Sequence, residues 1–493
     1  MNPSTTEART REAVLNTLGE LGGQLTKAEE VEYQGTQFVL PGSYRGNVLN
    51  AAKFLMDLHE SEEREMQFSR SFTYRPWDGA NATQEAFREL FGASTPQATW
   101  GMFGKTPPQL MTINVGPGET MQVPWGDMTV PGLDGLTFTL GGTTDPEYGS
   151  VFQLSAVGPR KWRHHVEGVF RAVEEKLISN SIYRGKAFDG KQMPDFLDLS
   201  TVDPSQVVYS DNVRRQLDAN VWSLIRHTEA TEKAGLPLKR AALLAGPYGT
   251  GKTLAAYLTA LECQENGWTF VYCRPNRDDL YEVMQTARMY QPSVVFFEDL
   301  EVMAGAQERD HISQLLDVFD GIQSKDAKIM AILTTNHADK IHKGMLRPGR
   351  LDAVIEIEKL DAAGIQQLVE NVVPSAALAE DLKHTHKDFE KGWAEITSAM
   401  DDFLPAFVRE AGERAVRYSL ARNGGKLTTV SKADLIDSAT GLRSQFELMD
   451  GAREVQERPR LETAMAALVS EAVVDLKLET IHGDPMGKVV AAD

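Results

Sequence analysis

Cysteine is scarce in this chain, with only Cys263 and Cys273 among 493 residues. One possible pair is too few for a disulfide framework, and the two lack metal-ligand spacing, so we expect small core residues in a reducing compartment. A run of about 18 apolar residues, which a membrane-spanning helix needs, is also missing. Residues 1–26 lack the apolar core of a signal peptide. These absences predict a cytoplasmic location and no membrane insertion.

Basic residues are outnumbered, since 51 Lys and Arg face 70 Asp and Glu, for a formal net charge of −19. Non-specific binding to DNA or RNA depends on basic side chains, so a nucleic-acid partner is not expected, although a local basic pore is compatible with this balance. The zinc-protease sequence H-E-x-x-H is absent as well, which excludes a fused protease of that class. The hydrophobic fraction of 42% is that of an ordinary globular protein, and the length suits about two to four domains.

Changes in composition divide the chain into segments. Residues 1–30 are predicted to be an N-terminal arm, and 31–178 an α+β accessory domain that recognises a partner. A polar, turn-rich stretch at 179–206 is predicted to be a linker. In the accessory domain we expect strands at 37–40, 111–115, 136–140 and 151–154, and helices at 48–70 and 162–178.

From residue 207 onward strands alternate with helices, which predicts parallel crossovers and a doubly wound α/β sheet. The large α/β subdomain is expected at 207–360, a small all-α lid at 361–450, and a C-terminal helix and tail at 451–493. The expected strands are 241–245, 269–273, 294–297, 328–334 and 353–357. The expected helices are 211–233, one from 252, 278–290, 312–319, 362–373, 402–422, 432–449 and 461–476.

A glycine-rich segment, Gly246–Thr253, follows the first of these strands and fits G-x-x-x-x-G-K-[ST]. An accidental glycine turn is the alternative, but a strand before it and a helix after it argue for a phosphate-binding loop. Glycines allow a turn whose backbone N–H groups face phosphate oxygens, and the helix N-terminus adds partial positive charge. Lys252 then reaches the β- and γ-phosphates, and the Thr253 hydroxyl binds Mg²⁺. The predicted nucleotide-binding residues are Gly246, Pro247, Tyr248, Gly249, Thr250, Gly251, Lys252, Thr253 and Leu254.

Two carboxylates, Glu298 and Asp299, end a later apolar strand. In phosphate-loop enzymes one acid at this place orients Mg²⁺ and the other polarises the attacking water. The usual order is Asp then Glu, and here it is reversed. We assign Glu298, with Thr253, to the metal and Asp299 to the water, while the reversed order leaves the opposite division open.

A further strand ends at Asn336, which is placed to orient the lytic water or to contact the γ-phosphate. His337 either lines the same site or has a structural role. Arg347 and Arg350 flank a Pro-Gly pair. Arginines at the edge of such a domain can reach the γ-phosphate of a neighbouring subunit and stabilise transition-state charge, which requires a ring of subunits.

Together, Gly246–Thr253, Phe296–Asp299, Thr334–Asn336 and Leu346–Asp352 resemble the phosphate loop, acidic strand, first sensor and arginine-finger segment of AAA ATPases. The resemblance extends over about 207–445. It implies ATP and Mg²⁺ as cofactors, hydrolysis of ATP to ADP and phosphate, and a homo-hexameric or heptameric ring. The implied catalytic residues are Asp299, Glu298, Asn336, Arg347 and Arg350.

The reversed acids and the segment from Thr334 to Arg350 are also similar to the branch that contains the mitochondrial translocase of the Rieske iron–sulfur protein. That branch has a β-rich domain before its ATPase domain, and its mitochondrial member has a membrane helix. In this chain residues 274–277 leave little room for an aromatic pore loop, so Tyr272 and Tyr281 are expected to be packing residues. Threading of an unfolded chain is therefore in doubt. The lid offers no evident second-sensor arginine, and Arg443 is a weak candidate.

These features predict an ATP-driven machine that remodels or translocates a protein partner, which the accessory domain selects. Three alternatives stay open: an unfoldase that serves a separate protease, a nucleic-acid motor or replication-protein loader, and a nucleotide-gated scaffold without turnover.

Overall fold

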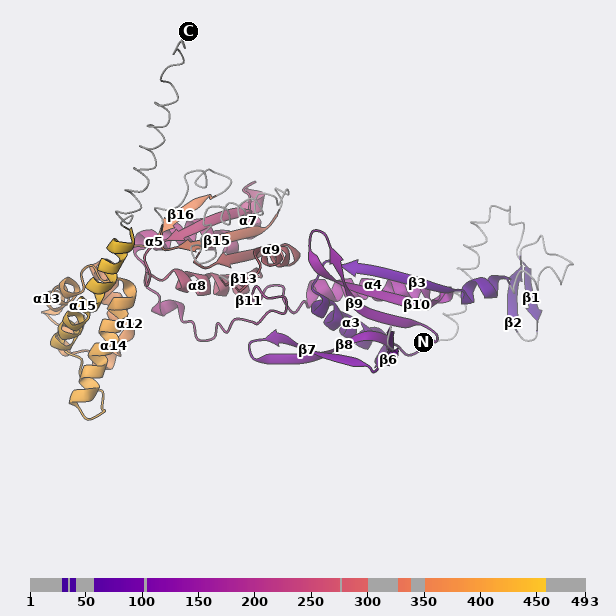
Figure 1. Ribbon diagram of the computed structural model, residues 1–493, viewed down its shortest axis with the longest axis horizontal. Helices are drawn as coiled ribbons and strands as arrows, with labels where there is room; N and C mark the ends of the chain where they lie inside the picture. The colour runs from indigo at the N-terminus through magenta and orange to yellow at the C-terminus, as the bar shows by residue number, and fades with distance from the viewer. Residues whose placement is uncertain are drawn as a thin grey trace, which may run out of the picture. The chain divides into compact units, whose positions relative to one another are not determined.

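The computed structural model describes residues 29–33, 36–40, 57–101, 104–274, 277–299, 327–337 and 351–457 (Figure 1). The chain forms two compact units. Unit 1 comprises the residues up to Arg184 together with Met193–Phe196, and unit 2 comprises Gly185–Gln192 and the residues from Leu197 onward. Within the described ranges, no helix combines the length and apolarity that a bilayer crossing requires.

Unit 1 is built on an antiparallel sheet with the order β3-β10-β9-β8-β4, in which β7 also pairs with β8. The helices α3 and α4 contact each other and β10 (Figure 1). Two short hairpins, β1 with β2 and β5 with β6, complete it. The bounds are β1 Glu29–Tyr33, β2 Thr36–Leu40, β3 Glu65–Phe72, α3 Pro76–Phe91, β4 Thr95–Pro96, β5 Thr99–Gly101, β6 Gly104–Thr106, β7 Gln109–Gly116, β8 Glu119–Thr129, β9 Thr137–Asp145, β10 Gly149–Pro159 and α4 Arg163–Ser179.

Sequence patterns identified only part of unit 1. The predicted strands and the helix at 162–178 are confirmed, but the helix predicted at 48–70 is wrong from residue 65 onward, where β3 begins. In β3 burial alternates along the chain, because Phe68, Arg70 and Phe72 are more buried than the residues between them, which is strand periodicity. Helix α3 was not predicted. It starts at Pro76, and Gly79 packs so closely on β10 that a Cβ there would lie 1.9 Å from the Phe152 ring.

Unit 2 contains a six-stranded, all-parallel sheet with the order β11-β13-β14-β15-β12-β16, which confirms the predicted α/β class. Helices α8 and α9 both contact β13 and β14. The alanines of α8 share one apolar core with Phe270, Tyr272 and Phe296. The bounds are β11 Ala187–Asp189, β12 Arg240–Ala245, α8 Lys252–Glu265, β13 Thr269–Cys273, α9 Leu280–Met289, β14 Ser293–Phe297, β15 Ile329–Thr335 and β16 Ala353–Glu356.

Two segments before β12 differ from expectation. Within the stretch predicted to be a linker, β11 forms the edge strand of the sheet, and the Gly190 N–H donates to Tyr272 O at 2.9 Å. The single helix predicted at 211–233 is broken: a π-helical turn, Asp218–Trp222, separates α5 from α6. That turn places the Trp222 indole N–H 3.0 Å from the Thr259 hydroxyl of α8. The bounds are α5 Asp211–Leu217, α6 Ser223–Arg226 and α7 Thr228–Lys233.

The lid is all-α, as predicted, and has its own apolar core around Trp393, Ile396 and Phe403. Three of its helices match predicted ones, and α13 was not predicted. The Asp361 side chain caps α12 by accepting the Gly364 N–H at 2.8 Å. The bounds are α12 Ala362–Val372, α13 Phe389–Ala399, α14 Pro405–Arg422 and α15 Lys432–Glu457. The helices predicted at 312–319 and 461–476 lie outside the described residues.

Candidate functional site

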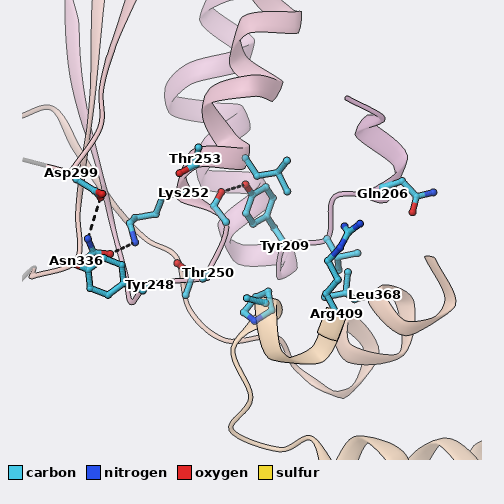
Figure 2. A pocket seen from close by; sticks show the side chains of 16 residues that line it. Gln206, Tyr209, Tyr248, Thr250, Lys252, Thr253, Asp299, Asn336, Leu368 and Arg409 are labelled. Atoms are coloured by element: carbon cyan, nitrogen blue, oxygen red, sulfur yellow. Dashed lines mark hydrogen bonds between the residues drawn. The ribbon is translucent and has the colours of Figure 1, made fainter. Parts of the chain in front are cut away.

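A cavity of about 340 Å³ lies in unit 2 where the carboxyl ends of the parallel strands meet the lid (Figure 2). Its floor is the glycine loop between β12 and α8, with Asp299 following β14 and Asn336 following β15. Ligands of open parallel sheets bind at this edge. The loop residues that line the cavity are Tyr248, Gly249, Thr250, Gly251, Lys252, Thr253 and Leu254.

The glycine loop has backbone angles that favour glycine. Gly249 and Gly251 have φ values of 81° and 102°, in the left-handed region. A Cβ on Gly249 would also lie 2.9 Å from the Ala406 Cβ of α14. The hydroxyl of Tyr209 donates to Gly251 O at 2.8 Å, which fixes the loop just before Lys252 begins α8.

Lys252 is buried at the bottom of the cavity. Its ammonium donates to Gly246 O at 2.7 Å, to Pro247 O at 2.9 Å and to Asn336 Oδ1 at 2.6 Å. The Asn336 amide in turn donates to Asp299 Oδ1 at 3.1 Å (Figure 2). A lysine from α8, an amide from the end of β15 and a carboxylate from the end of β14 therefore form one chain of hydrogen bonds.

Glu298 faces a different set of groups. The Thr253 hydroxyl donates to its Oε1 at 2.5 Å, and the Tyr272 hydroxyl donates to its Oε2. Burial, and then the hydrogen bond to Glu298, raise the pKa of Tyr272 far above its ordinary value. Tyr272 is therefore a neutral donor at physiological pH. It was predicted to be a packing residue, and its stacking on Phe296 confirms that role, but the contact with Glu298 was missed.

Asp299 has an unusual backbone conformation, with φ at 46°. Asp and Asn tolerate this left-handed region better than longer side chains because they are short and polar. The Asp299 N–H donates to the Thr334 hydroxyl at 2.8 Å, which ties the turn to β15. The two adjacent acids thus diverge, Glu298 toward Thr253 and Asp299 toward Asn336.

The site suits a nucleotide with a divalent cation. Mg²⁺ prefers oxygen ligands and shares them with phosphates and water, and the Thr253 hydroxyl and the Glu298 carboxylate are such oxygens at the start of α8. In the part of the chain that the structure describes, no group of three or more His, Cys, Asp or Glu gathers to bind a metal.

The two cysteines, Cys263 and Cys273, are both buried. Burial raises the pKa of both thiols, as expected of core residues.

Sequence reasoning missed the wall opposite the glycine loop. Ala406 N donates to Gly249 O at 3.1 Å, so the first turn of α14 touches the loop directly. Arg409 lies three positions later, on the same helix face, where its Nε donates to Glu413 at 3.1 Å. The wall consists of Gln206, Val208, Tyr209, Leu368, Pro405, Ala406 and Arg409. Pro405 was the one residue in the sequence that could have indicated where α14 begins, because proline is common at the first position of a helix.

Other predicted residues have different outcomes. Arg443 lies elsewhere in the lid, where it donates to Ala399 O at 2.8 Å and stacks over Phe403. The Tyr281 side chain is 51% exposed, so the packing role predicted for it is wrong. The His337 N–H donates to the Thr335 hydroxyl at 3.0 Å. The arginines Arg347 and Arg350 lie outside the described residues.

Comparison with known proteins agrees with this geometry. Residues 242–359 match the ATPase family associated with various cellular activities (AAA). The matched range contains the glycine loop, both acids and Asn336.

Three curated relatives are similar to part of the chain. A cell division cycle protein 48 homologue from Archaeoglobus fulgidus is 28% identical over 277 residues, which cover 52% of this chain and 35% of the relative. Protein SAV from Sulfolobus acidocaldarius is 30% identical over 246 residues, 46% of this chain and 30% of the relative. A probable inactive ATP-dependent zinc metalloprotease, FTSHI 2 of Arabidopsis thaliana chloroplasts, is 26% identical over 313 residues, 60% of this chain and 34% of the relative. The chain thus spans about a third of the length of these relatives.

Proposed function

We propose, from the AAA domain at residues 242–359, that this chain binds ATP with Mg²⁺ and hydrolyses it to ADP and phosphate. The observation that carries the proposal is the hydrogen-bonded chain from Lys252 through Asn336 to Asp299, beside the pair of Thr253 and Glu298. This arrangement puts a cation, a metal-side carboxylate and a second carboxylate around the mouth of one phosphate-binding loop.

Each side chain then has a distinct task. The backbone N–H groups of the loop and the Lys252 ammonium hold the phosphates. The Thr253 hydroxyl donates a hydrogen bond to Glu298, which leaves the hydroxyl lone pairs available to a metal. Mg²⁺, when bound, neutralises phosphate charge. Asp299 accepts a proton from the attacking water, and Asn336 keeps that carboxylate aimed at the γ-phosphate.

The opposite wall accommodates the rest of the nucleotide. Gln206 and Leu368 lie at the end of the cavity away from Asn336, so the base and ribose fit between the segment before α5 and the lid (Figure 2). Apolar surface there suits an aromatic base, because pockets for cofactors combine apolar walls with a few polar groups.

Binding and turnover test the proposal directly. The wild-type chain is expected to bind a fluorescent ATP analogue and to release phosphate in the presence of Mg²⁺. Lys252→Ala removes a charged hydrogen-bond donor, which contributes about 1.5–3 kcal/mol, so affinity should fall about 10- to 100-fold. A wild-type protein that binds ATP without releasing phosphate would instead support the nucleotide-gated scaffold.

We further propose that the chain forms a homo-hexameric or heptameric ring, in which Arg347 and Arg350 reach the site of a neighbouring subunit and unit 1 selects a protein to be remodelled or translocated. The sequence from Arg347 to Arg350 supports this reading, because an arginine supplied by a neighbouring subunit can stabilise the charge of the transition state. The order of Glu298 and Asp299, with the antiparallel sheet of unit 1, supports a place in the branch of the Rieske-protein translocase.

Native mass spectrometry with ATP and with ADP tests the ring. Arg347→Ala should abolish most ATPase activity while each subunit still binds ATP. Activity that does not change with protein concentration, in a particle with the mass of one chain, would contradict the ring. Stimulation of turnover by DNA would favour a nucleic-acid motor instead.

A further inference from the structure

Tyr272 approaches the site from the neighbouring strand. It is paired with Phe296 in the register of β13 and β14, two residues before Glu298. Its ring stacks on Phe296 at 5.8 Å and 3°, and on Tyr257 of α8 at 6.4 Å and 25°. The side chain is 7% exposed. An aromatic ring held on both sides has few rotamers available, so its hydroxyl has a well-defined position.

The hydroxyl of Tyr272 completes the contacts of the Glu298 carboxylate. Tyr272 donates to Oε2 and Thr253 donates to Oε1, so each carboxylate oxygen accepts a hydrogen bond from a different element. Hydrogen bonds to an ionised group are about twice as strong as neutral ones. The carboxylate is therefore oriented from one side by β13 and from the other by the start of α8.

The backbone separates Glu298 from its neighbour. The Glu298 N–H is 3.4 Å from Cys273 O, which continues the pairing of β14 with β13, whereas Asp299 turns into the left-handed region. Glu298 has the longer side chain and occupies the position from which a carboxylate must reach Tyr272. Asp299 has the shorter side chain and occupies the position where the backbone conformation favours Asp. The order Glu-Asp matches both requirements.

We propose that Tyr272 is a positioning residue that holds Glu298 on the metal side of the site, and that with the left-handed turn at Asp299 it assigns the two acids to different tasks. The proposal rests on the proposed ATPase function. It goes further because the different roles of Glu298 and Asp299 then depend on a residue of β13, which belongs neither to the glycine loop nor to the acidic pair. Outer residues that orient metal-binding groups typically change metal affinity about 10- to 100-fold when they are mutated.

Metal binding measured without turnover tests this role. Mn²⁺ is titrated into the full chain with a non-hydrolysable ATP analogue and followed by electron paramagnetic resonance. Tyr272→Phe keeps the ring stack and removes only the hydroxyl, so Mn²⁺ affinity should fall about 10-fold. Affinity for the same analogue in EDTA should stay at the wild-type value. Tyr257→Phe is the matched control, since it removes a hydroxyl from the same stack without touching the bond to Glu298.

A double-mutant cycle sharpens the assignment. Glu298→Asp shortens the side chain, which withdraws the carboxylate from Tyr272. If the two groups act together, the losses in Mn²⁺ affinity from Tyr272→Phe and Glu298→Asp should not add in the double variant.

Three results would overturn the proposal. They are wild-type Mn²⁺ affinity in Tyr272→Phe, losses that add fully in the cycle, and a loss of analogue binding in EDTA, which would make Tyr272 a structural residue only. Failure of the ATPase proposal has a different signature, because the wild-type chain itself would then either bind no nucleotide, with or without metal, or bind ATP without releasing phosphate.

Discussion

At the residue scale, the turn at Asp299 explains why the two adjacent acids point toward different groups. A left-handed φ of 46° suits Asp and Asn, and it turns the side chain away from Glu298 toward Asn336. The sequence could identify both acids from the strand that precedes them. It could not show which groups Glu298 contacts, because Thr253 and Tyr272 are distant from it in the chain.

Asp299→Asn should therefore separate binding from catalysis. Asn keeps the size and the tolerance for the left-handed region, so the thermal midpoint and the affinity for ATP should stay near wild-type values. Loss of the proton acceptor should lower kcat about 100-fold or more. The measurements are phosphate release at saturating ATP and a titration of ATP binding. Asp299→Glu is the contrasting variant, because it keeps a carboxylate but is expected to lower the thermal midpoint, since Glu tolerates the left-handed region less well than Asp. Wild-type turnover in Asp299→Asn would show that Asp299 is not the proton acceptor.

At the element scale, prediction succeeded where burial is complete. The strands β12 to β15 are almost completely buried and carry continuous apolar runs, so predicted ends fall within about a residue of the observed ones. It failed for α3, whose buried residues include Asp78, Gly79 and Asn81, residue types that usually indicate turns or exposed positions. The cavity wall formed by Gln206 and Arg409 was missed for another reason. Those residues meet only through tertiary packing.

Arg409 lies in the second turn of α14, on the face that meets the cavity. Its guanidinium is a donor to nucleotide oxygens or a cation over the base. Arg409→Ala is expected to raise KM for ATP several-fold with kcat nearly unchanged, and Arg409→Lys to restore part of the affinity. Steady-state kinetics of both variants provide the check, with Arg417→Ala, farther along the same helix, as control. If KM for ATP is unchanged in Arg409→Ala, Arg409 does not contact the nucleotide, and its contact with Glu413 is its only supported role.

The start of α15 should make lid stability depend on pH. Hydrogen bonds from Arg422 lower the pKa of Asp434 to about 2, and Asp434 also accepts the Ser431 N–H. Because the folded-state pKa is depressed, the ionised carboxylate stabilises the lid above about pH 4, and this contribution disappears as the pH falls toward 2. Asp434→Asn should therefore lower the midpoint for unfolding at pH 7 and lose its difference from wild type near pH 2. A constant difference across that range would contradict the assignment.

At the scale of the whole molecule, the two units have separate cores and separate sheet types. Unit 1 is antiparallel and alternates buried with exposed residues, whereas unit 2 is parallel and buried on both faces. Sequence texture separated them because Gly- and Thr-rich turns end where helix–strand alternation begins. The edge strand β11 escaped prediction, since its three residues carry too little signal.

Gly79→Ala tests whether each unit depends on its own core. The added methyl would overlap the Phe152 ring, and overpacking of a core typically costs about 1–3 kcal/mol. Unit 1 should therefore unfold at a lower temperature, while ATP binding to unit 2 persists. Calorimetry with and without ATP analogue resolves the two, because ligand stabilises only the unit that binds it. A parallel loss of ATP affinity would mean that the units fold as one.

The bond from Ala406 to Gly249 has a mechanical consequence. Helix α14 has 18 residues, so it is a rod about 27 Å long that is hydrogen-bonded near its first residue to the glycine loop. A tilt of about 10° around that pin swings the far end of the rod by about 5 Å, from the rise of 1.5 Å per residue. A small rotation of α14 about its contact with Gly249 would thus produce a much larger displacement at the other end of the helix.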